Sequence, residues 1–244
     1  MSRSSHNKTG AAKQADLWIW NNEDCLKGNR NLVDLISNAE KIRKQKFNDA
    51  EQAANWATSR GKLRKILSKY TGTSAANLRF GTSDYGKPEL IGHQLLGLDF
   101  NISHAWPFSA LVVSTACRVG VDLEELQELS QDEMDWPLSQ RERADLAKSP
   151  PTERVDAFFR YWTLKEAFIK AIGLGVSFPL HNFDISPISE PPSVLRINDH
   201  RESAKFWHLE TRKLNPHIRW AIAAESMGAP LAINFCEMPE FKAE

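Results

Sequence analysis

The segment between Pro150-Pro151 and Gly173 constrains the fold of this chain more than any other. We expect one long helix here, with Thr152 as its N-cap and Ile172 near its end, because the glycine that follows stops it. At about 100° per residue its apolar side chains gather on one broad face, which is typical of a helix packed on a core. These side chains are Phe158, Tyr161, Leu164, Phe168, Ile169 and Ile172.

Short strand-like segments come before and after this helix. The same rough order, helices and then several short strands, occurs twice along the chain. We therefore expect an α+β chain of two similar subdomains, over 16–117 and 118–244, after a disordered polar leader at 1–15. The helical stretches are 31–69 in two pieces and a short helix opened by the capping box Ser139–Glu142, and the strands are 17–20, 98–102, 110–114, 119–123, 182–186, 205–211, 217–223 and 231–236.

Composition excludes several classes of protein. Of 244 residues, 41% are hydrophobic and 25% are charged, which is ordinary for a globular chain and excludes disordered and fibrous ones. The 31 basic and 31 acidic side chains cancel, so there is no broad positive field for nucleic acid or anionic lipid. There is no apolar run long enough for a membrane span and no signal peptide, and three scattered cysteines suit a reducing compartment. We therefore expect a cytoplasmic protein that binds neither nucleic acid nor membrane.

The acidic stretch Gly120-Val121-Asp122-Leu123-Glu124 is the first candidate site. In a strand, residues two apart share a face, so Asp122 and Glu124 point together while Val121 and Leu123 point into a core. Two carboxylates on one face repel unless a cation lies between them, and a set of oxygen ligands suits Mg²⁺. The alternative is a strand that ends in a solvated acidic turn and binds no ligand.

Polar residues of the long helix form the second candidate site. Lys165 falls inside the apolar face, which is unusual for a lysine, whereas Trp162, Glu166 and Lys170 lie on its flank. For Lys165, the alternative is a buried stem with its ammonium group in water. For Glu166 and Lys170, the alternative is an ordinary helix ion pair that stabilises by roughly 0.2–0.5 kcal/mol.

Two further segments have the chemistry to contact phosphate. Ser103 and His104 leave a strand for a loop, where side chains and backbone N–H groups can hold an anion, and Lys87 follows a glycine and precedes a proline in a rigid turn. A lone histidine is more often structural, and such a turn is common. A serine hydrolase is disfavoured, because adjacent side chains diverge in an extended chain and no triad spacing is present.

Taken in order, these segments resemble the pattern of the 4′-phosphopantetheinyl transferases of the surfactin-synthetase-activating (Sfp) type. That pattern is a Gly-Lys-Pro turn, Asn-x-Ser-His, Gly-hydrophobic-Asp-hydrophobic-Glu and Trp-Ser/Thr-x-Lys-Glu-Ala-x-x-Lys-x-x-Gly. The resemblance covers roughly residues 16–235 and is thin over 21–58 and after 190. Beyond the last motif the sequence also follows the family, as far as Leu180. The four motifs occur here at Gly86–Pro88, Asn101–His104, Gly120–Glu124 and Trp162–Gly173.

The resemblance implies an enzyme that moves the 4′-phosphopantetheine arm of coenzyme A to a serine of an apo carrier protein and releases adenosine 3′,5′-bisphosphate. It implies that Asp122, Glu124 and Glu166 bind Mg²⁺, with Mn²⁺ as an alternative ion. Glu166 would also be the general base, assisted by Lys170 and His104 as the other catalytic residues. The residues that would contact coenzyme A are Arg60, Lys87, Ser103, His104, Lys165 and Lys170.

The 3′-phosphate of coenzyme A is the part of the site that the resemblance defines least. Arg60 matches an arginine near the start of a basic, leucine-bearing helix in the family. An arginine that many members carry shortly after a phenylalanine like Phe47 is replaced here by the stretch Ala50–Ala54. Further basic candidates for the 3′-phosphate are Lys41, Lys44 and Lys46.

The family fold is a pseudo-dimer of two similar α/β subdomains with the active site in the cleft between them, so we expect a monomer. The partner would be an acyl, polyketide or peptidyl carrier protein, and the sequence does not say which. Two other functions stay open at this point. One is a non-catalytic module that binds a carrier protein or coenzyme A, and the other is a Mg²⁺-dependent coenzyme A pyrophosphate hydrolase that uses water in place of serine.

Overall fold

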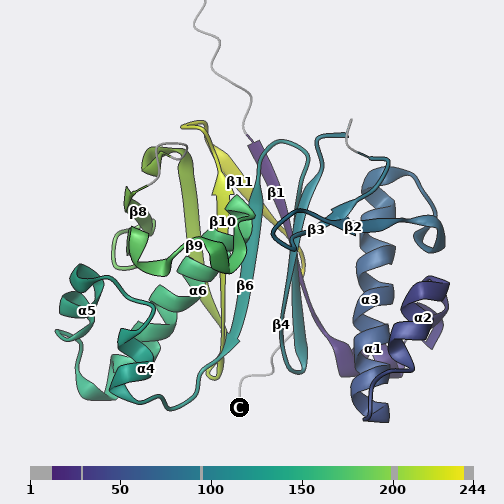
Figure 1. Cartoon of the computed structure of the whole chain (residues 1–244), viewed down its shortest axis with the longest axis horizontal. Coiled ribbons are helices and arrows are strands. Elements are labelled where there is room, and N and C mark those ends of the chain that lie inside the picture. Colours follow the sequence, from purple (N-terminus) through teal and green to yellow (C-terminus); the bar gives the residue numbers. More distant parts are fainter. Residues whose placement is uncertain (1–12, 29, 94–95, 199–202, 239–244) are drawn as a thin grey trace, which may run out of the picture.

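The computed structural model describes residues 13–238 except 29, 94–95 and 199–202, and its first half combines a long helix with an antiparallel sheet (Figure 1). The helices of this half are α1 (Asn22–Gly28), α2 (Asn38–Lys44) and α3 (Ala50–Thr71), with short 3-10 turns at Arg30–Leu35 and Ala75–Asn77. Its strands are β1 (Lys13–Asn21), β2 (Phe80–Thr82), β3 (Pro88–Leu90), β4 (Asp99–Ala105) and β5 (Phe108–Ser114).

The second half begins with a strand and again contains one long helix. Its helices are α4 (Gln131–Asp135), α5 (Gln140–Leu146) and α6 (Arg154–Ile172), with 3-10 turns at Pro151–Glu153, Gly175–Ser177, Leu180–Asn182 and Ala204–Phe206. Its strands are β6 (Val119–Glu125), β7 (Phe183–Ser186), β8 (Ser193–Ile197), β9 (Trp207–Asn215), β10 (Ile218–Glu225) and β11 (Leu231–Glu237).

The two halves build their sheets in the same way. In the first half β1, β5 and β4 lie in that order with antiparallel neighbours, and in the second half β6, β10 and β9 do the same. Each half also has a small antiparallel pair of strands, β2–β3 or β7–β8, and a long helix on the outer face of its sheet. This mixture of helices and antiparallel sheets confirms the predicted α+β class.

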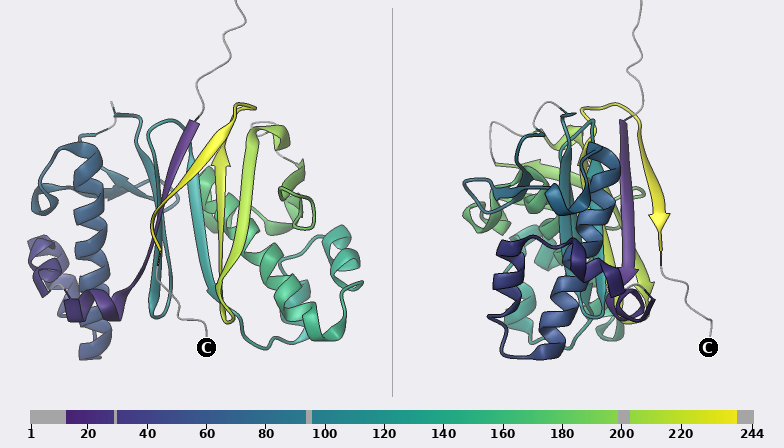
Figure 2. Two further views of the ribbon diagram at one scale, coloured as in Figure 1. Left: turned by 180° about the vertical axis from the view of Figure 1, so that it is seen from behind. Right: turned by 90° about the vertical axis from the view of Figure 1, so that its right-hand side faces the viewer.

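An apolar core fills the space between the two sheets. Alternate residues of β1 and β6, such as Leu17 and Ile19 on one and Val121 and Leu123 on the other, point into it and are buried. The opposite faces of the sheets pack against α3 and α6. The result is four layers in the order helix, sheet, sheet, helix (Figure 2).

The last strand crosses from the second half to the first. β11 pairs in parallel with β1, with Leu231 opposite Lys13 and Phe235 opposite Leu17 (Figure 2). Without β11, the outer edge of β1 would expose unpaired backbone N–H and C=O groups. Residues 231–237, which we predicted in the C-terminal subdomain, thus complete the first sheet.

Local sequence signals predicted several element ends correctly. Gly173 ends α6 in the left-handed conformation, with φ of 73°, and Ser139 and Glu142 form the predicted capping box of α5. Thr152 is not the N-cap of α6. It lies in a 3-10 turn instead, and α6 begins at Arg154.

Two other boundaries differ from the prediction. Residues 13–15, expected in the disordered leader, begin β1, and the remainder of that leader, 1–12, lies outside the described residues. Ser103 and His104 are not in a loop, because β4 continues through them to Ala105 before the turn. Among the described helices, none has both the length and the apolar character needed to cross a bilayer.

Candidate functional site

Strand β6 and helix α6 carry most of the predicted site residues and pack against each other very closely. Gly120 is the reason, since a Cβ atom there would lie 2.1 Å from the carbonyl oxygen of Ala167. Only glycine lets the helix backbone approach the strand to this distance. Asp122 and Glu124 on the strand, and Glu166 on the helix, are therefore held by one tightly packed unit.

Asp122 is buried, with 1% of its surface exposed, and its Oδ1 accepts two hydrogen bonds. The Lys170 ammonium group donates at 2.5 Å and the Ser103 hydroxyl donates at 3.1 Å. Lys170 Nζ also lies 3.1 Å from Ser103 Oγ, so these three side chains form a closed triangle. The triangle joins β4 of the first half to β6 and α6 of the second.

The negative charge of Asp122 acts on both Glu124 and Glu166. Burial and the charge of Asp122 raise the pKa of Glu124 to about 7, and the same two causes raise the pKa of Glu166. Trp162 Nε1 donates to Glu124 Oε1 at 2.9 Å, so α6 also orients this carboxylate. Carboxylates that are buried beside another negative charge favour either a proton or a bound cation.

The three carboxylates offer oxygen donors of the kind that a hard divalent cation prefers, but they do not form a complete cage. Asp122 Oδ2 is buried and has no hydrogen-bond partner among the described residues. Throughout the residues that the structure describes, no three His, Cys, Asp or Glu side chains lie close enough together to hold a metal ion. At Asp122 Oδ1 the Lys170 ammonium already supplies a positive charge, which leaves Oδ2 as the oxygen that lacks a counterpart.

His104 lies on the opposite face of β4 from Ser103, as expected for neighbours in an extended chain. Its Nδ1 is 2.8 Å from the hydroxyl oxygen of Ser109, its partner residue on β5. Burial, and then the positive charges of Lys170 and Arg60, lower the pKa of His104 to about 4. Because this pKa lies well below 7, the imidazole is neutral at pH 7. Part of the residue is exposed, so the ring is accessible.

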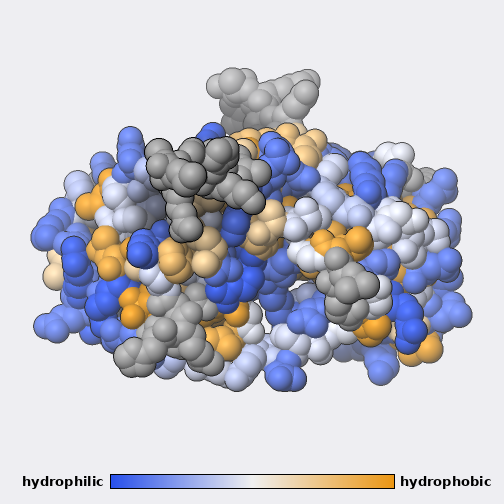
Figure 3. All heavy atoms as spheres, turned by 90° about the horizontal axis from the view of Figure 1, so that it is seen from above, coloured by the Kyte–Doolittle hydropathy of each residue, from blue (hydrophilic) through white to orange (hydrophobic). Residues whose placement is uncertain are grey.

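A cavity of about 550 Å³ lies beside His104. Two tryptophans, Trp56 and Trp106, give it apolar walls, and Arg60 and His104 give it polar ones. All of its described lining residues come from the first half of the chain, so it is not a cleft between the halves. None of Lys41, Lys44 and Lys46 is among them. On the face shown in Figure 3, polar residues predominate and apolar ones are scattered.

Arg60 lines this cavity, and Glu40 and Phe80 fix the position of its side chain. Its Nε donates to Glu40 Oε1, and its guanidinium carbon lies 3.9 Å from the centre of the Phe80 ring. The other carboxylate oxygen of Glu40 accepts from Arg64, which is 2% exposed, at 2.7 Å. Glu40 thus orients both arginines, and Arg60 is the one that lines the cavity.

Lys165 does not reach the site in this structure. It is fully buried, and its ammonium group donates to both carboxylate oxygens of Glu142 and to the backbone oxygen of Phe183, at 2.7–2.9 Å. An ammonium group has three hydrogens, so none is left for a phosphate. The predicted contact between Lys165 and coenzyme A is therefore absent here, because a buried ion pair of α5 and α6 occupies this lysine.

Lys87 is occupied in a similar way. Its side chain is 10% exposed, and its Nζ lies 2.7 Å from Asp99 Oδ2, close to two backbone oxygens as well. The structure thus brings together Ser103, Asp122 and Lys170, places Arg60 and His104 on one cavity, and keeps Lys87 and Lys165 apart from both.

Comparison with known proteins identifies the family. The model of the 4′-phosphopantetheinyl transferase superfamily matches residues 118–225, the segment that carries β6 and α6. The transferase HetI of Nostoc is 32% identical over 187 residues, which span 74% of each chain. The chain belongs to the 4′-phosphopantetheinyl transferase superfamily. Its likeness to the Bacillus subtilis transferase Sfp, 25% identical over 87% of this chain and 92% of that one, confirms the predicted Sfp type of phosphopantetheinyl transferase.

A phosphopantetheinyl transferase of the rat is also similar over most of this chain. The rat L-aminoadipate-semialdehyde dehydrogenase-phosphopantetheinyl transferase is 28% identical over 78% of this chain and 67% of its own length.

Several residues around the site were missed by sequence reasoning. Ser109 and Asn22 are buried behind His104, where Asn22 Nδ2 donates to Ser109 Oγ at 2.9 Å. Glu40 and Glu142 hold Arg60 and Lys165 from other helices. The capping box signals that Glu142 bonds locally, but nothing in the sequence links these residues to partners 20 or more positions away.

Proposed function

We propose that this chain transfers the 4′-phosphopantetheine group of coenzyme A to a serine hydroxyl of an apo acyl, polyketide or peptidyl carrier protein, with release of adenosine 3′,5′-bisphosphate. The observation that carries the proposal is the triangle of Ser103, Asp122 and Lys170, which joins residues of three of the four matching motifs. Relatives named as phosphopantetheinyl transferases support the same reaction class.

The two halves would act as a pseudo-dimer within one monomer, with the reaction taking place where β4 meets β6. The matching arrangement of β1, β5 and β4 in one sheet and of β6, β10 and β9 in the other supports this view. So does the position of β4, which is an edge strand and offers Ser103 on one face and His104 on the other. Coenzyme A would lie around this edge, between the cavity of Arg60 and the carboxylates.

Glu166 would be the general base for the attacking serine hydroxyl, directly or through a water molecule. A base works best when its pKa is near the operating pH, and burial together with Asp122 raises the pKa of Glu166 toward that range. Lys170 would neutralise negative charge on the leaving phosphate, because its flexible ammonium group lies beside the carboxylates.

Asp122, Glu124 and Glu166 would hold Mg²⁺ or Mn²⁺, which when bound would neutralise the pyrophosphate of coenzyme A. The unpartnered Oδ2 of Asp122 and the raised pKa values of the two glutamates support this set of ligands.

Arg60, Ser103 and His104 would contact the phosphates and ribose of coenzyme A. Arg60 and His104 share one cavity, and a charge-assisted contact from an oriented guanidinium suits a phosphate dianion. Trp56 and Trp106 would supply apolar surface beside it. Lys87 and Lys165 are left out of this set, because their ammonium groups are bonded to protein acceptors.

Intact-mass spectrometry of a panel of apo carrier proteins tests the proposal. With coenzyme A, Mg²⁺ and this protein, at least one carrier should gain the mass of one phosphopantetheine group on its serine. No gain across a broad panel would favour the non-catalytic binding module. Phosphopantetheine released in the absence of any carrier would favour the hydrolase.

A further inference from the structure

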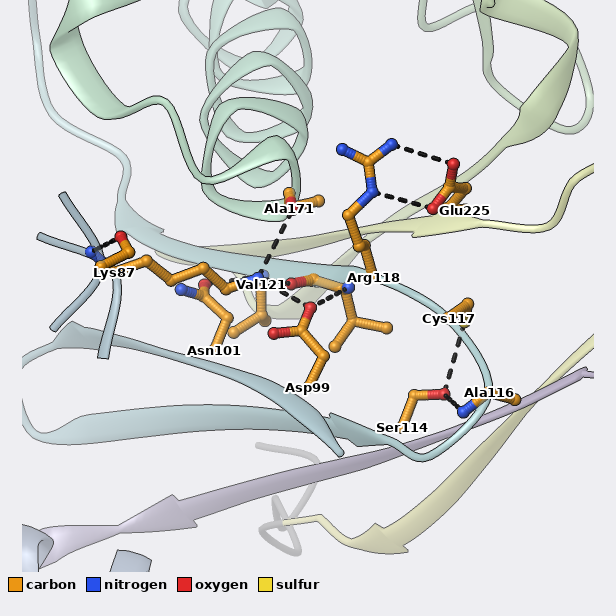
Figure 4. Close-up of polar contacts among 12 residues, drawn as sticks. Lys87, Asp99, Asn101, Ser114, Ala116, Cys117, Arg118, Val121, Ala171 and Glu225 are labelled. Carbon is orange, nitrogen blue, oxygen red and sulfur yellow. Dashed lines mark hydrogen bonds and ion pairs between the residues drawn. The ribbon is translucent and has the colours of Figure 1, made fainter. Parts of the chain in front are cut away.

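The Lys87 ammonium group lies at the junction of the two halves and bonds to both. Lys87 comes from the turn between β2 and β3 and donates to Asp99 Oδ2 on β4 at 2.7 Å (Figure 4). It also lies 3.1 Å from the backbone oxygen of Val119 on β6 and 3.4 Å from that of Ala171 in the last turn of α6. A helix leaves its last four carbonyl groups without intrahelical partners, and a cation is favourable there.

Strand β6 is the edge of its sheet on the side that faces β4. It pairs with β10 on one side, so the backbone groups that point the other way need different partners. Side chains of β4 supply them: Asp99 Oδ2 accepts from the Val119 N–H at 2.7 Å, and Asn101 Oδ1 accepts from the Val121 N–H at 3.0 Å.

The Lys87–Asp99 ion pair therefore satisfies both backbone groups of Val119, the N–H through Asp99 and the C=O through Lys87. Asp99, Asn101 and Ser103 are alternate residues of β4, so all three point to the same side. Together they form a ladder of side chains that takes the place of a backbone partner strand, and its last rung is the Ser103–Asp122 hydrogen bond.

We infer that Lys87 and Asp99 are positioning residues, which fix β6 and α6 against β4 and so set the carboxylates of Asp122 and Glu166 relative to Ser103. This inference rests on the proposed function of those groups. Lys87 bonds to the first residue of β6 and to the last turn of α6. Next to these contacts, Gly120 lets β6 and α6 pack closely together. A shift at Val119 is therefore transmitted to Asp122, three residues along the same strand.

The test compares Lys87→Met, Asp99→Asn and the double variant, with Lys62→Met as a matched control. Lys62 also makes a half-buried ion pair, 2.8 Å from Glu237, but on α3 and away from the carboxylates. For each protein we would measure kcat and KM for coenzyme A with a modifiable carrier, and the affinity for Mn²⁺ alone by electron paramagnetic resonance.

We expect both single variants to lose roughly 10- to 100-fold in kcat, because small displacements of catalytic groups are costly, with KM for coenzyme A changed by less than about twofold. Mn²⁺ should bind about tenfold more weakly. The loss in the double variant should be smaller than the product of the two single losses, since both changes break the Lys87–Asp99 ion pair. Lys62→Met should match wild type in all three measurements.

Two results would overturn the inference. If Lys87→Met raises KM for coenzyme A at least about tenfold while Asp99→Asn does not, Lys87 contacts the phosphates. If both variants match Lys62→Met in kcat and Mn²⁺ affinity, the ladder does not position the site. Should Lys87→Met fail to fold, Asp99→Asn makes the same test, because it keeps the size of the side chain.

The Mn²⁺ measurement also separates this inference from the proposed function. If wild type modifies no carrier, the proposed function fails, yet weaker Mn²⁺ binding in both variants still supports the positioning role. If wild type binds no Mn²⁺, there is no metal site for Lys87 and Asp99 to position, and the inference fails as well.

Discussion

Glu166 is the residue on which the proposed proton transfer depends most directly. We predict that Glu166→Gln lowers kcat by about 10²–10⁴-fold, because the amide keeps the shape of the side chain but cannot accept the serine proton. Stability should not fall, because Lys170 pairs with Asp122 and because burial and the charge of Asp122, which raise the pKa of Glu166, already disfavour its ionised form. Single-turnover kinetics and calorimetric binding of coenzyme A measure these effects.

The matched control is Glu153→Gln, which changes an exposed glutamate just before α6. Its turnover should equal that of wild type. Wild-type turnover in Glu166→Gln as well would remove Glu166 from the proposed chemistry and leave it a half-buried residue of the helix without a catalytic role.

His104 should show an unusual titration. Its pKa is lowered from 6.5 to about 4, so between these values the unfolded chain binds a proton that the folded chain excludes. Stability should therefore be unaffected by this group above about pH 6.5 and fall as the pH decreases below it. Solvent on the exposed side of the ring will screen part of the effect.

A nuclear magnetic resonance titration of the imidazole should give a midpoint well below 6. Urea denaturation at pH 5 and pH 7.5 gives the free energy of unfolding at each pH. Its decrease from pH 7.5 to pH 5 should be smaller in His104→Gln than in wild type. The lowered pKa of His208 is common to both proteins and cancels in this comparison. A midpoint near 6.5, with equal acid losses, would contradict the prediction.

At the scale of elements, the Lys165–Glu142 ion pair joins α6 to α5, and Glu142 also accepts from the Ile185 N–H of β7 at 2.8 Å. Both side chains are almost completely buried. Removing one partner of a buried pair leaves an uncompensated charge, so Lys165→Met should lower the free energy of unfolding by about 3–5 kcal/mol.

Coenzyme A affinity should be unchanged in the Lys165→Met protein that remains folded. Urea denaturation and calorimetry make the two measurements. The opposite pattern, normal stability with weakened coenzyme A binding, would return Lys165 to the phosphate site that the family resemblance implied.

At the scale of the whole molecule, β11 ties the end of the chain to the first sheet. A truncation after Pro230 removes the half-buried Leu231 and Ile233, which pack against the core between the sheets. Since full burial of such side chains contributes about 1.5–3 kcal/mol each, we predict a loss of roughly 2–3 kcal/mol in the free energy of unfolding. The exposed edge of β1 should also promote aggregation.

Urea denaturation and light scattering measure both effects of the truncation. A shorter truncation after Met238 keeps the strand and should leave stability unchanged. If the two truncated proteins are equally stable, β11 contributes nothing to the first sheet.

The sequence predicted those features that depend on neighbours along the chain. Alternation along β6 correctly placed Val121 and Leu123 in the core and Asp122 on the other face. Gly173 marked the end of α6, because only a residue tolerant of positive φ closes a helix in this way. Likewise the ordered motifs were enough to indicate the family, since each is a short local pattern.

The tertiary structure decided which charged groups are available for chemistry. Lys87 and Lys165 have the same side chain as Lys170, but Asp99 and Glu142 occupy the first two, while Lys170 lies beside Asp122 and Ser103. These partners come from elements distant in the sequence, as does β11 on β1. Local patterns determine how each element begins, ends and faces, whereas the partner of a buried charge or of a strand edge depends on how the elements pack together.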